Sequence, residues 1–318
     1  MKNNVIPIFF SVDEGYAPYL AAALCSAVEN SSKDRNYRAI VLYQDLKDET
    51  IGKIKGLARD NFEIDFVPMG KGMESITDRM SNRLRCDYFT LTIYFRLFIP
   101  AMFPQYNKGI YIDSDVILLH DIAELFDTDI GDNFIGACYD SSISEIEPLV
   151  RYTAEAVGAG KEEYINSGVL LMNLKALREA KLEENFLSLL NTYHFDCVAP
   201  DQDYLNAMCS GKIHYLSERW DTMPRENSDP VFDPALIHYN LFSKPWCYDN
   251  IQYGEHFWHY AEKSGFIDEI KAFKESYSDE QKKSDMECLD LLIRRAAEIT
   301  QSDVTFKKIK AQGVKVRL

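Results

Sequence analysis

Two aspartates, Asp113 and Asp115, stand one residue apart inside an otherwise apolar run, GIYIDSDVILLH, at residues 109–120. In an extended chain, residues i and i+2 project to the same side, so the two carboxylates face the same way. Their repulsion, about 1–4 kcal/mol at close approach depending on the local dielectric, disfavours the pair, and burial adds a further cost. A divalent cation between them removes both penalties. The pattern indicates a metal site, and a turn at the end of a strand is the alternative.

The spacing alone is a weak signal, because it occurs twice more, at 127/129 and 201/203. Only Asp113 and Asp115 lie between two apolar, strand-like runs. That context favours them as ligands, and the 127/129 match is interpreted as a coincidence.

A second candidate group lies in the motif ALIHYNLFSKPWCYD, where a strand-like run ends in His238 and Lys244 follows six residues later. A neutral imidazole is a suitable third ligand for a metal that carboxylates already hold. The ammonium group of Lys244 can hold phosphate oxygens, and Pro245 would fix the turn that aims it. A buried core histidine followed by a surface lysine is the alternative.

The motif YINSGVLLMNL places Asn166 and Ser167 just before Gly168 and an apolar strand. An amide at the entrance of a strand can bond a sugar hydroxyl. It can equally cap its own turn, and the residues alone favour that simpler interpretation.

The motif PDQDYLNAM opens a helix at Pro200, with Asp201, Gln202 and Asp203 in the first turn. Acidic residues there complement the helix dipole without any further role. The functional alternative is that these three side chains face a reacting centre that develops positive charge.

The strands and helices that position these residues can be predicted from the order of segments along the chain. Strand, helix and strand alternate through the first 120 residues, which predicts an α/β fold with a mostly parallel sheet flanked by helices. Ligands of such sheets bind at the carboxyl ends of the strands, where Asp13, Asp113 and Asp115 stand. The expected strands are 6–12, 37–45, 62–69, 133–140, 167–174, 212–218 and 235–240, and the expected helices are 13–30, 47–60, 175–191 and 201–209.

The last part of the chain has a different pattern of apolar and charged residues. Apolar residues at helical spacing and a potential capping box, Ser278 with Gln281, predict a helical segment packed on or beside the main domain. We therefore expect a catalytic domain at 1–260 and a helical C-terminal segment at 261–318. The spaced apolar residues are Met286, Leu289, Leu292, Ala296 and Ile299.

The tail TFKKIKAQGVKVRL carries five basic residues and no acid, in a chain whose net charge is −15. It is interpreted as a solvated terminus, with peripheral contact to a membrane or a partner as the alternative. The basic residues are Lys307, Lys308, Lys310, Lys315 and Arg317.

Composition restricts the function classes. An acidic chain lacks the basic face that a general nucleic-acid binder needs, so we expect no nucleic-acid partner. Seven scattered cysteines without a C-x-x-C pair are typical of reduced thiols and predict neither disulfides nor a zinc site. The N-terminal apolar stretch is too short for a signal peptide, and no run is long enough to span a membrane. We expect a cytoplasmic protein, with membrane association as a possibility.

Four motifs occur in a fixed order: YFRLFIP…GIYIDSDVIL, YINSGVLLMNL, PDQDYLN and HYNLFSKPW. As a set, they resemble the family 8 glycosyltransferases, which include bacterial lipopolysaccharide glucosyl- and galactosyltransferases and glycogenin. The resemblance covers roughly residues 5–260. It implies a GT-A fold and a retaining transfer of a hexose, glucose or galactose, from a UDP-sugar. It also implies dependence on Mn²⁺ or Mg²⁺ and a glycan, lipid-linked glycan or protein as acceptor.

The resemblance also implies roles for individual residues. The implied metal ligands are Asp113, Asp115 and His238. The residues implied to bind the donor are Ser11, Asp13, Tyr16, Arg96, Ser114, Asn166 and Lys244, with the first three on uridine and Lys244 on phosphate. The residues implied in catalysis are Asp201, Gln202 and Asp203. Gln202 would stabilise the cationic transition state beside the anomeric carbon, and Asn166 and Asp201 would hold sugar hydroxyls.

Two positions depart from the family pattern. Gly15 stands where members often carry an amide, so one uridine contact is expected to be missing. Leu241 stands where many have a glycine that lets the backbone approach the phosphates, so the loop is expected to follow a different path.

The resemblance further implies a mechanism that relies on electrostatics and positioning, without a covalent intermediate, in which the leaving phosphate takes the proton of the acceptor. Retaining hydrolases usually need two carboxylates about 5 Å apart, and no such pair is evident. One rival is a non-catalytic UDP-sugar-binding protein. Another is a sugar-nucleotide nucleotidyltransferase, which usually has a basic, glycine-rich loop after the first strand, whereas SVDEGYAP is acidic.

Overall fold

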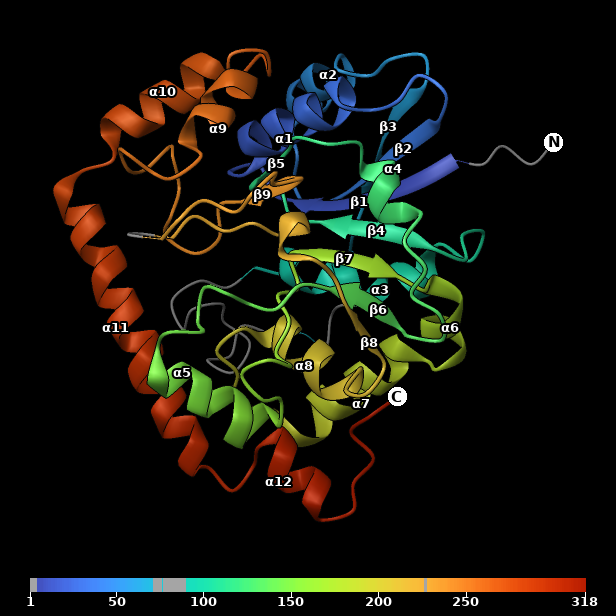
Figure 1. Cartoon of the computed structure of the whole chain (residues 1–318), viewed down its shortest axis with the longest axis vertical. Helices are drawn as coiled ribbons and strands as arrows, with labels where there is room; N and C mark the ends of the chain where they lie inside the picture. Colours follow the sequence, from blue (N-terminus) through green and yellow to red (C-terminus); the bar gives the residue numbers. More distant parts are fainter. Residues whose placement is uncertain (1–4, 71–75, 77–89, 226–227) are drawn as a thin grey trace.

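The computed structural model describes residues 5–70, 76, 90–225 and 228–318. The centre of the fold is a seven-stranded sheet (Figure 1). The strand order is β3-β2-β1-β4-β7-β6-β8, and a separate two-stranded sheet pairs β5 with β9. The strands are β1 Val5–Val12, β2 Asn36–Tyr43, β3 Phe62–Pro68, β4 Gly109–Ile112, β5 Val116–Leu118, β6 Ile135–Ala137, β7 Val169–Met172, β8 Ile213–Tyr215 and β9 Leu236–His238.

The helices connect and cover these strands. The α-helices are α1 Ala17–Glu29, α2 Asp48–Lys55, α3 Phe95–Met102, α4 Ile122–Phe126, α5 Glu147–Tyr152, α6 Leu174–Glu179, α7 Leu182–Tyr193, α8 Pro200–Met208, α9 Gly254–Ala261, α10 Ile267–Ser276, α11 Asp279–Gln301 and α12 Phe306–Ala311. Three short turns of other helix types are η2 Thr92–Tyr94, η3 Thr153–Val157 and η4 Glu218–Trp220.

The strands β1, β2 and β3 are parallel, because α1 and α2 carry the chain back between them. In β1, Ile8 and Phe10 pack into the core on one side of the sheet, and Phe9 packs into the core on the other side. A strand buried on both faces is a continuous apolar run, which explains why the sequence predicted it.

The other half of the sheet mixes directions. β4 is parallel to β1, β7 is antiparallel to β4 and to β6, and β8 is parallel to β6. The carboxyl end of β4 therefore meets the amino end of β7, where Ile112 pairs with Val169. The amide of Asp113 continues this pairing by donating to the carbonyl of Gly168 at 2.8 Å. The predicted metal ligands thus stand beside the motif that begins β7.

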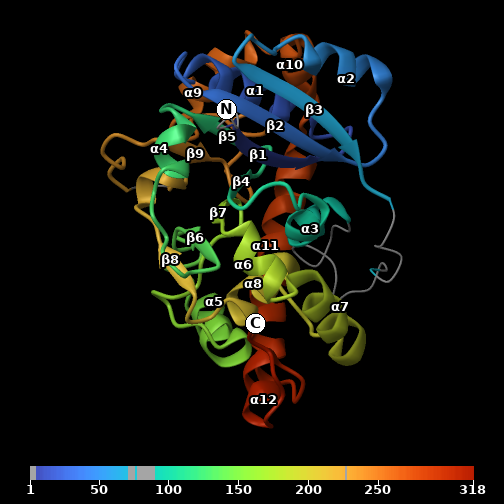
Figure 2. The ribbon, with the colours of Figure 1, turned by 90° about the vertical axis from the view of Figure 1, so that its right-hand side faces the viewer.

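Two apolar cores hold the sheet between helices. Leu24 of α1, Phe257 of α9 and Ile270 of α10 belong to one core, and these helices lie at the top of Figure 2. Residues from α3, α7, α8 and α11 form the other core, with Phe186 and Leu292 among them. Both faces are covered, as the predicted α/β architecture requires.

The C-terminal segment is helical, as predicted. Ser278 and Gln281 form the expected capping box at the start of α11. α11 runs along one edge of the molecule from α10 to α12 (Figure 1). Its second half buries Leu292, Ala296 and Ile299, whereas Met286 is 58% exposed. The first half of α11 is therefore anchored by other contacts, described below.

Several boundaries differ from the predicted ones. The helix expected over 175–191 is two helices, α6 and α7, because the backbone of Lys181 turns into the left-handed region at φ 58. The predicted domain boundary at 260/261 stays a prediction. In the described part of the chain, six cysteines are free thiols, and no helix there is long and apolar enough to cross a membrane.

Candidate active site

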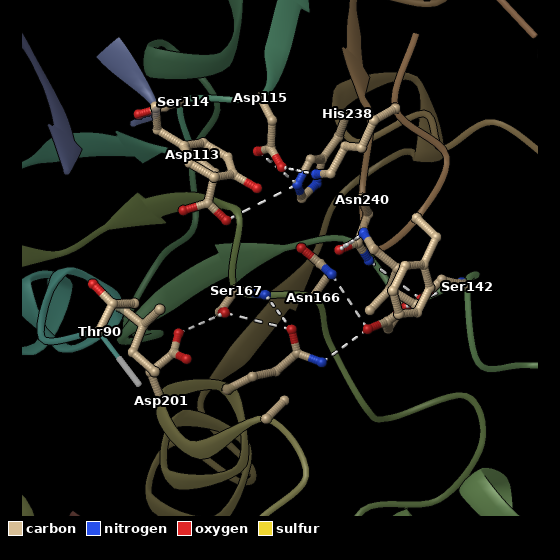
Figure 3. A pocket seen from close by; sticks show the side chains of 18 of the residues that line it. Thr90, Asp113, Ser114, Asp115, Ser142, Asn166, Ser167, Asp201, His238 and Asn240 are labelled. Atoms are coloured by element: carbon tan, nitrogen blue, oxygen red, sulfur yellow. Dashed lines mark hydrogen bonds and ion pairs between the residues drawn. The ribbon is translucent and has the colours of Figure 1, made fainter. Parts of the chain in front are cut away.

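A cavity of about 500 Å³ opens at the carboxyl ends of β1 and β4. It is bounded by the start of α8, the loop after β9 and the C-terminal helices. Figure 3 shows Asp113, Asp115 and His238 on one side of this pocket and Asn166, Ser167 and Asp201 on the other. The structure thus brings together residues from four motifs that are far apart in the sequence.

The Asp113, Asp115 and His238 side chains form one cluster whose ligand atoms lie within 4.8 Å of one another. His238 Nε2 is 3.4 Å from Asp115 Oδ1 and 3.9 Å from Asp113 Oδ2. The pairing of β5 with β9 produces this arrangement, because Val116 is the strand partner of His238. Two carboxylates and an imidazole are a suitable ligand set for a borderline divalent metal.

Two further residues show that the cluster fits a metal ion. Asp221, fully buried, accepts a hydrogen bond from His238 Nδ1 at 2.8 Å, which leaves Nε2 toward the carboxylates. Such a carboxylate behind a metal-binding histidine is usual in metal sites. Gly168 provides the space, because a Cβ there would lie 2.3 Å from His238 Cε1 and 2.8 Å from Asp113 Oδ2.

The charges of the cluster are mutually stabilised. Burial disfavours the charged imidazole, but Asp221 and Asp115 raise the pKa of His238 to about 10, so a metal ion would take the place of the Nε2 proton. Burial acts against the carboxylate of Asp115, but Lys244 and His238 hold its pKa well below its ordinary value. Asp115 is therefore an anion at neutral pH and is available as a ligand.

Lys244 is turned toward the metal cluster. Its Nζ forms an ion pair with Asp115 Oδ2 and donates to the carbonyl of Tyr239 at 2.5 Å. The same Nζ lies 6.0 Å from the centre of the Tyr16 ring. Lys244 thus stands between the metal cluster and Tyr16, one of the residues predicted to contact uridine.

Arg96 connects the two sides of the pocket. Its Nη2 is 2.8 Å from Asp113 Oδ1, and its Nε is 3.1 Å from Asp201 Oδ2. Its Nη1 donates to the carbonyl of Ser167 at 2.5 Å, and its guanidinium lies 4.2 Å from the centre of the Tyr111 ring. Burial opposes the charge, but Asp113 and Asp201 raise the pKa of Arg96 above its ordinary value. Arg96 is a permanent cation that fixes both carboxylates.

Gln202 is held from both ends of its amide. Its Oε1 accepts from the amide of Ser167 at 2.9 Å, and its Nε2 donates to Asp140 Oδ2 at 2.8 Å. Asn166 Nδ2 donates to the same oxygen of Asp140 at 3.2 Å. These bonds fix the orientation of two predicted site amides, Asn166 and Gln202, along one wall of the pocket.

The prediction that Asp203 faces the reacting centre does not hold. Its carboxylate is fully buried and accepts hydrogen bonds from Tyr152 and Tyr164 at 2.6 and 2.7 Å. It also accepts from the amides of Val198 and Ala199, and it is not among the residues that line the cavity. Successive side chains of a helix diverge around its axis, so Asp203 instead anchors α8 to its surroundings.

The residues predicted to contact uridine, Ser11, Asp13 and Tyr16, lie together at the carboxyl end of β1. Ser11, Asp13, Gly15, Tyr16 and Ser114 all line the cavity. The side chain of Ser114 donates to the carbonyl of Ser11 at 2.8 Å, which ties the D-x-D segment to the end of β1. Asp13 Oδ1 accepts from the amide of Tyr16 at 3.0 Å and so shapes the turn into α1.

Leu241 keeps a conformation that favours glycine. Its φ is 51, in the left-handed region, and its amide donates to Asn240 Oδ1 at 2.7 Å. Leu241 is also among the residues that line the cavity.

Several site residues escaped the sequence analysis. Asp221 belongs to no recognised motif, and its role depends on contact with His238 across the fold. Asp140 is the last residue of the expected strand 133–140, and Asp13 directly follows the first expected strand; a carboxylate at the end of a strand was the available signal. The C-terminal segment adds four lining residues, Phe273, Tyr277, Asp285 and Leu292.

A model of the protein family described as Glycosyl transferase family 8 matches residues 7–250. This chain belongs to glycosyltransferase family 8. The protein is therefore a glycosyltransferase, and the resemblance found in the sequence is confirmed.

The similar proteins agree with this assignment. A putative glycosyltransferase of Haemophilus influenzae is 29% identical over 70% of this chain and 65% of its own length. A lipopolysaccharide 1,2-glucosyltransferase of Escherichia coli is 24% identical over 79% of this chain and 77% of its own length. The solved structure of the galactosyltransferase LgtC, in complex with donor and acceptor sugar analogues, has a TM-score of 0.69. It is 26% identical and aligns over 81% of this chain and 96% of its own.

The likeness to LgtC confirms the predicted fold class, a GT-A fold with a mostly parallel sheet flanked by helices and a helical C-terminal region. In this family 8 chain, the cluster of two aspartates and a histidine is the candidate divalent-metal site, of the D-x-D type.

Proposed function

We propose that this family 8 protein transfers a hexose, glucose or galactose, from a UDP-sugar to a hydroxyl of a glycan, lipid-linked glycan or protein acceptor, with retention of configuration. The observation that supports a metal-dependent reaction is the arrangement around His238. Asp221 fixes Nδ1, Nε2 faces Asp115, and Gly168 leaves room beside the ring.

Asp113, Asp115 and His238 would hold Mn²⁺ or Mg²⁺. The ion would supply positive charge to neutralise the leaving diphosphate. Lys244 would add a second cation on the phosphates, from its place between the cluster and Tyr16.

The donor would lie along the pocket from the nucleoside to the sugar. Ser11, Asp13 and Tyr16 would bind uridine at the end of β1, while Asn166 and Asp201 would bind sugar hydroxyls. Gln202 would place its fixed carbonyl oxygen beside the anomeric carbon, since Asp140 and Ser167 hold the amide. A preorganised dipole stabilises developing positive charge without reorganising during the reaction.

UDP release tests this proposal. The protein is incubated with Mn²⁺ and either UDP-glucose or UDP-galactose, and the wild type is compared with Asp115→Asn. Release by the variant should fall by at least about a hundredfold, because losing a ligand costs more than losing an outer partner. Asp129→Asn is the matched control, because this exposed aspartate belongs to the coincidental 127/129 match. Equal release by wild type and Asp115→Asn would contradict the metal assignment.

Two further readouts separate the alternatives. If the enzyme retains configuration, NMR of slow UDP-glucose hydrolysis should show α-glucose before the β-anomer appears. Pyrophosphate exchange in place of UDP release would favour a nucleotidyltransferase. UDP binding without turnover of either donor would favour a non-catalytic binding protein.

We also propose a cytoplasmic enzyme that contacts the membrane surface through its basic tail. Lys307, Lys310, Lys315 and Arg317 are exposed around α12, and each basic residue near an anionic surface adds about 1 kcal/mol of attraction. Co-sedimentation with anionic vesicles, but not with neutral ones, is expected. The double variant Lys310→Gln with Lys315→Gln should reduce it, and equal sedimentation of both proteins would contradict this role.

A further inference from the structure

The outer wall of the pocket comes from beyond the part of the chain that the family model matches. That match ends at residue 250, yet Phe273, Tyr277, Asp285 and Leu292 line the cavity. Asp285 and Leu292 lie about two helical turns apart, so they share one face of α11. The C-terminal helices are thus part of the site.

Asp285 is held in place through one of its two oxygens. The hydroxyls of Tyr248 and Tyr277 both donate to Oδ2, each at 2.6 Å. Burial and the bond to Asp285 raise the pKa of both hydroxyls, so they remain protonated donors. For Oδ1, no hydrogen bond is found among the described residues. One oxygen is fixed from behind, and the other can accept a bond from a ligand in the cavity.

Asp285 lies at the end of the pocket where the nucleoside is proposed to bind. Ring contacts run from Tyr16 to Tyr19 at 5.5 Å, from Tyr19 to Phe273 at 6.5 Å and from Phe273 to Tyr277 at 5.7 Å. Tyr16 is the predicted uridine contact after β1, whereas Gln202 and its partners form a separate hydrogen-bonded group. The carboxylate of Asp285 therefore belongs with the aromatic residues near Tyr16.

We propose that the C-terminal helices form the outer wall of the nucleoside subsite and that Asp285 is a donor-specificity residue. Its Oδ1 accepts a hydrogen bond from the nucleoside of the donor. This inference rests on the proposed use of a UDP-sugar.

The chemistry restricts what Asp285 can recognise. An ionised carboxylate only accepts hydrogen bonds, so its partner is an N–H or O–H group. Uracil offers N3–H, whereas cytosine carries a lone pair at that position, and the ribose offers its hydroxyls. Gly15, beside Tyr16, has no side chain that could contact the nucleoside, and a contact from α11 would supply recognition there.

Calorimetry with Mn²⁺ and UDP tests the proposal on the full chain. Asp285→Asn should weaken UDP binding by about tenfold or more, the effect of losing a charged hydrogen bond. Asp290→Asn, an exposed position on the same helix, is the matched control and should bind UDP as the wild type does. Thermal unfolding of both variants should stay close to that of the wild type, because an asparagine oxygen can still accept from the tyrosines.

Two other nucleotides identify the group that Asp285 contacts. If Asp285 binds uracil N3–H, Asp285→Asn should narrow the preference for UDP over CDP. If it binds a ribose hydroxyl, the variant should narrow the preference for UDP over 2′-deoxy-UDP. Either result supports the proposal.

Unchanged affinities of Asp285→Asn for all three nucleotides would overturn the inference. An equal loss for all three together with a lower melting temperature would also overturn it, because that result indicates a purely structural role. In both cases, metal-dependent UDP binding that Asp115→Asn abolishes would leave the proposed function standing. If the wild type binds no UDP with Mn²⁺, the proposed function and this inference both fail.

Discussion

Asp221 accepts a hydrogen bond from His238 Nδ1 at 2.8 Å, and the opposite nitrogen of the same ring faces the carboxylate of Asp115 at 3.4 Å. Asp221 is 1% exposed and is not among the residues that line the cavity. Its effect on a metal is therefore indirect, through the orientation and basicity of the imidazole.

Replacing Asp221 with asparagine should weaken Mn²⁺ binding by about 10–100-fold, the usual effect of removing the charge behind a metal-binding histidine. Calorimetric titration with Mn²⁺ in the presence of UDP measures the change. Asp132→Asn, at an exposed position, is the control. Unchanged Mn²⁺ affinity of Asp221→Asn would show that Asp221 serves packing alone.

Gly168→Ala should damage the metal cluster. The new methyl group would lie 2.3 Å from His238 Cε1, closer than real contacts allow, so either the ring or β7 must move. We expect a loss of about 1–3 kcal/mol in the free energy of unfolding, typical of overpacking, together with loss of Mn²⁺ binding. Denaturant unfolding and calorimetry measure the two effects.

Gly52→Ala provides the matched control for that substitution. Gly52 lies within α2, and a Cβ there meets nothing within 4 Å. Because alanine favours helix over glycine by up to about 1 kcal/mol, this variant should be slightly stabilised and should bind Mn²⁺ normally. A Gly168→Ala protein that behaves like Gly52→Ala would contradict the close packing described for His238.

Arg96→Lys should greatly reduce both stability and UDP release, even though it keeps the positive charge. The guanidinium reaches Asp113, Asp201 and Ser167 at once, whereas an ammonium group cannot reproduce that planar fork. Leaving a buried carboxylate without its partner typically costs about 3–5 kcal/mol. Unfolding experiments should show a substantial part of this loss, and UDP release should fall with it. If stability and UDP release both stay near the wild-type values, the charges of Asp113 and Asp201 do not depend on Arg96.

The buried carboxyl group of Asp203 should make the stability of the protein depend on pH. Burial raises the pKa of its carboxyl to about 6, although the hydroxyls of Tyr152 and Tyr164 act to lower it. The folded-state pKa then exceeds the ordinary value of 3.8. The folded protein therefore binds this proton more tightly than the unfolded chain does. The stabilisation is complete below about pH 4 and is lost as the pH rises through 6.

Asp203→Asn cannot ionise, so the variant should gain stability relative to the wild type by about 3 kcal/mol between pH 4 and pH 7. Denaturant unfolding at several pH values measures the difference. Asp303→Asn, on the surface, should show no such trend. A constant difference between Asp203→Asn and the wild type would mean that Asp203 is ionised throughout.

The sequence could predict those parts of the site that lie within short motifs. Asp113 and Asp115 were predicted to stand at the carboxyl end of a buried strand, and this prediction is confirmed because β4 ends at Ile112. His238 could be predicted as a metal ligand because a strand-like apolar run ends at this residue. In each case, local sequence determines the local structure, and the family pattern supplies the pairing.

Contacts across the fold could not be predicted in this way. Nothing around Asp221 indicates that its carboxylate lies behind His238. Nothing in the first turn of α8 shows that Asp201 faces the cavity while Asp203 faces Tyr152 and Tyr164. Such distinctions depend on the rotation of a helix about its axis, which the packing of the whole domain determines.

The long helix α11 has a consequence for how the protein is made. Every strand and both aspartates of the metal cluster leave the ribosome before α11 does, so a nascent chain can have its sheet and still lack the outer wall of the pocket. A stop codon or a protease cut between α10 and α11 would leave the cluster of Asp113, Asp115 and His238 in the chain while removing Asp285 and Leu292. The pocket is therefore completed only after α11 has been synthesised.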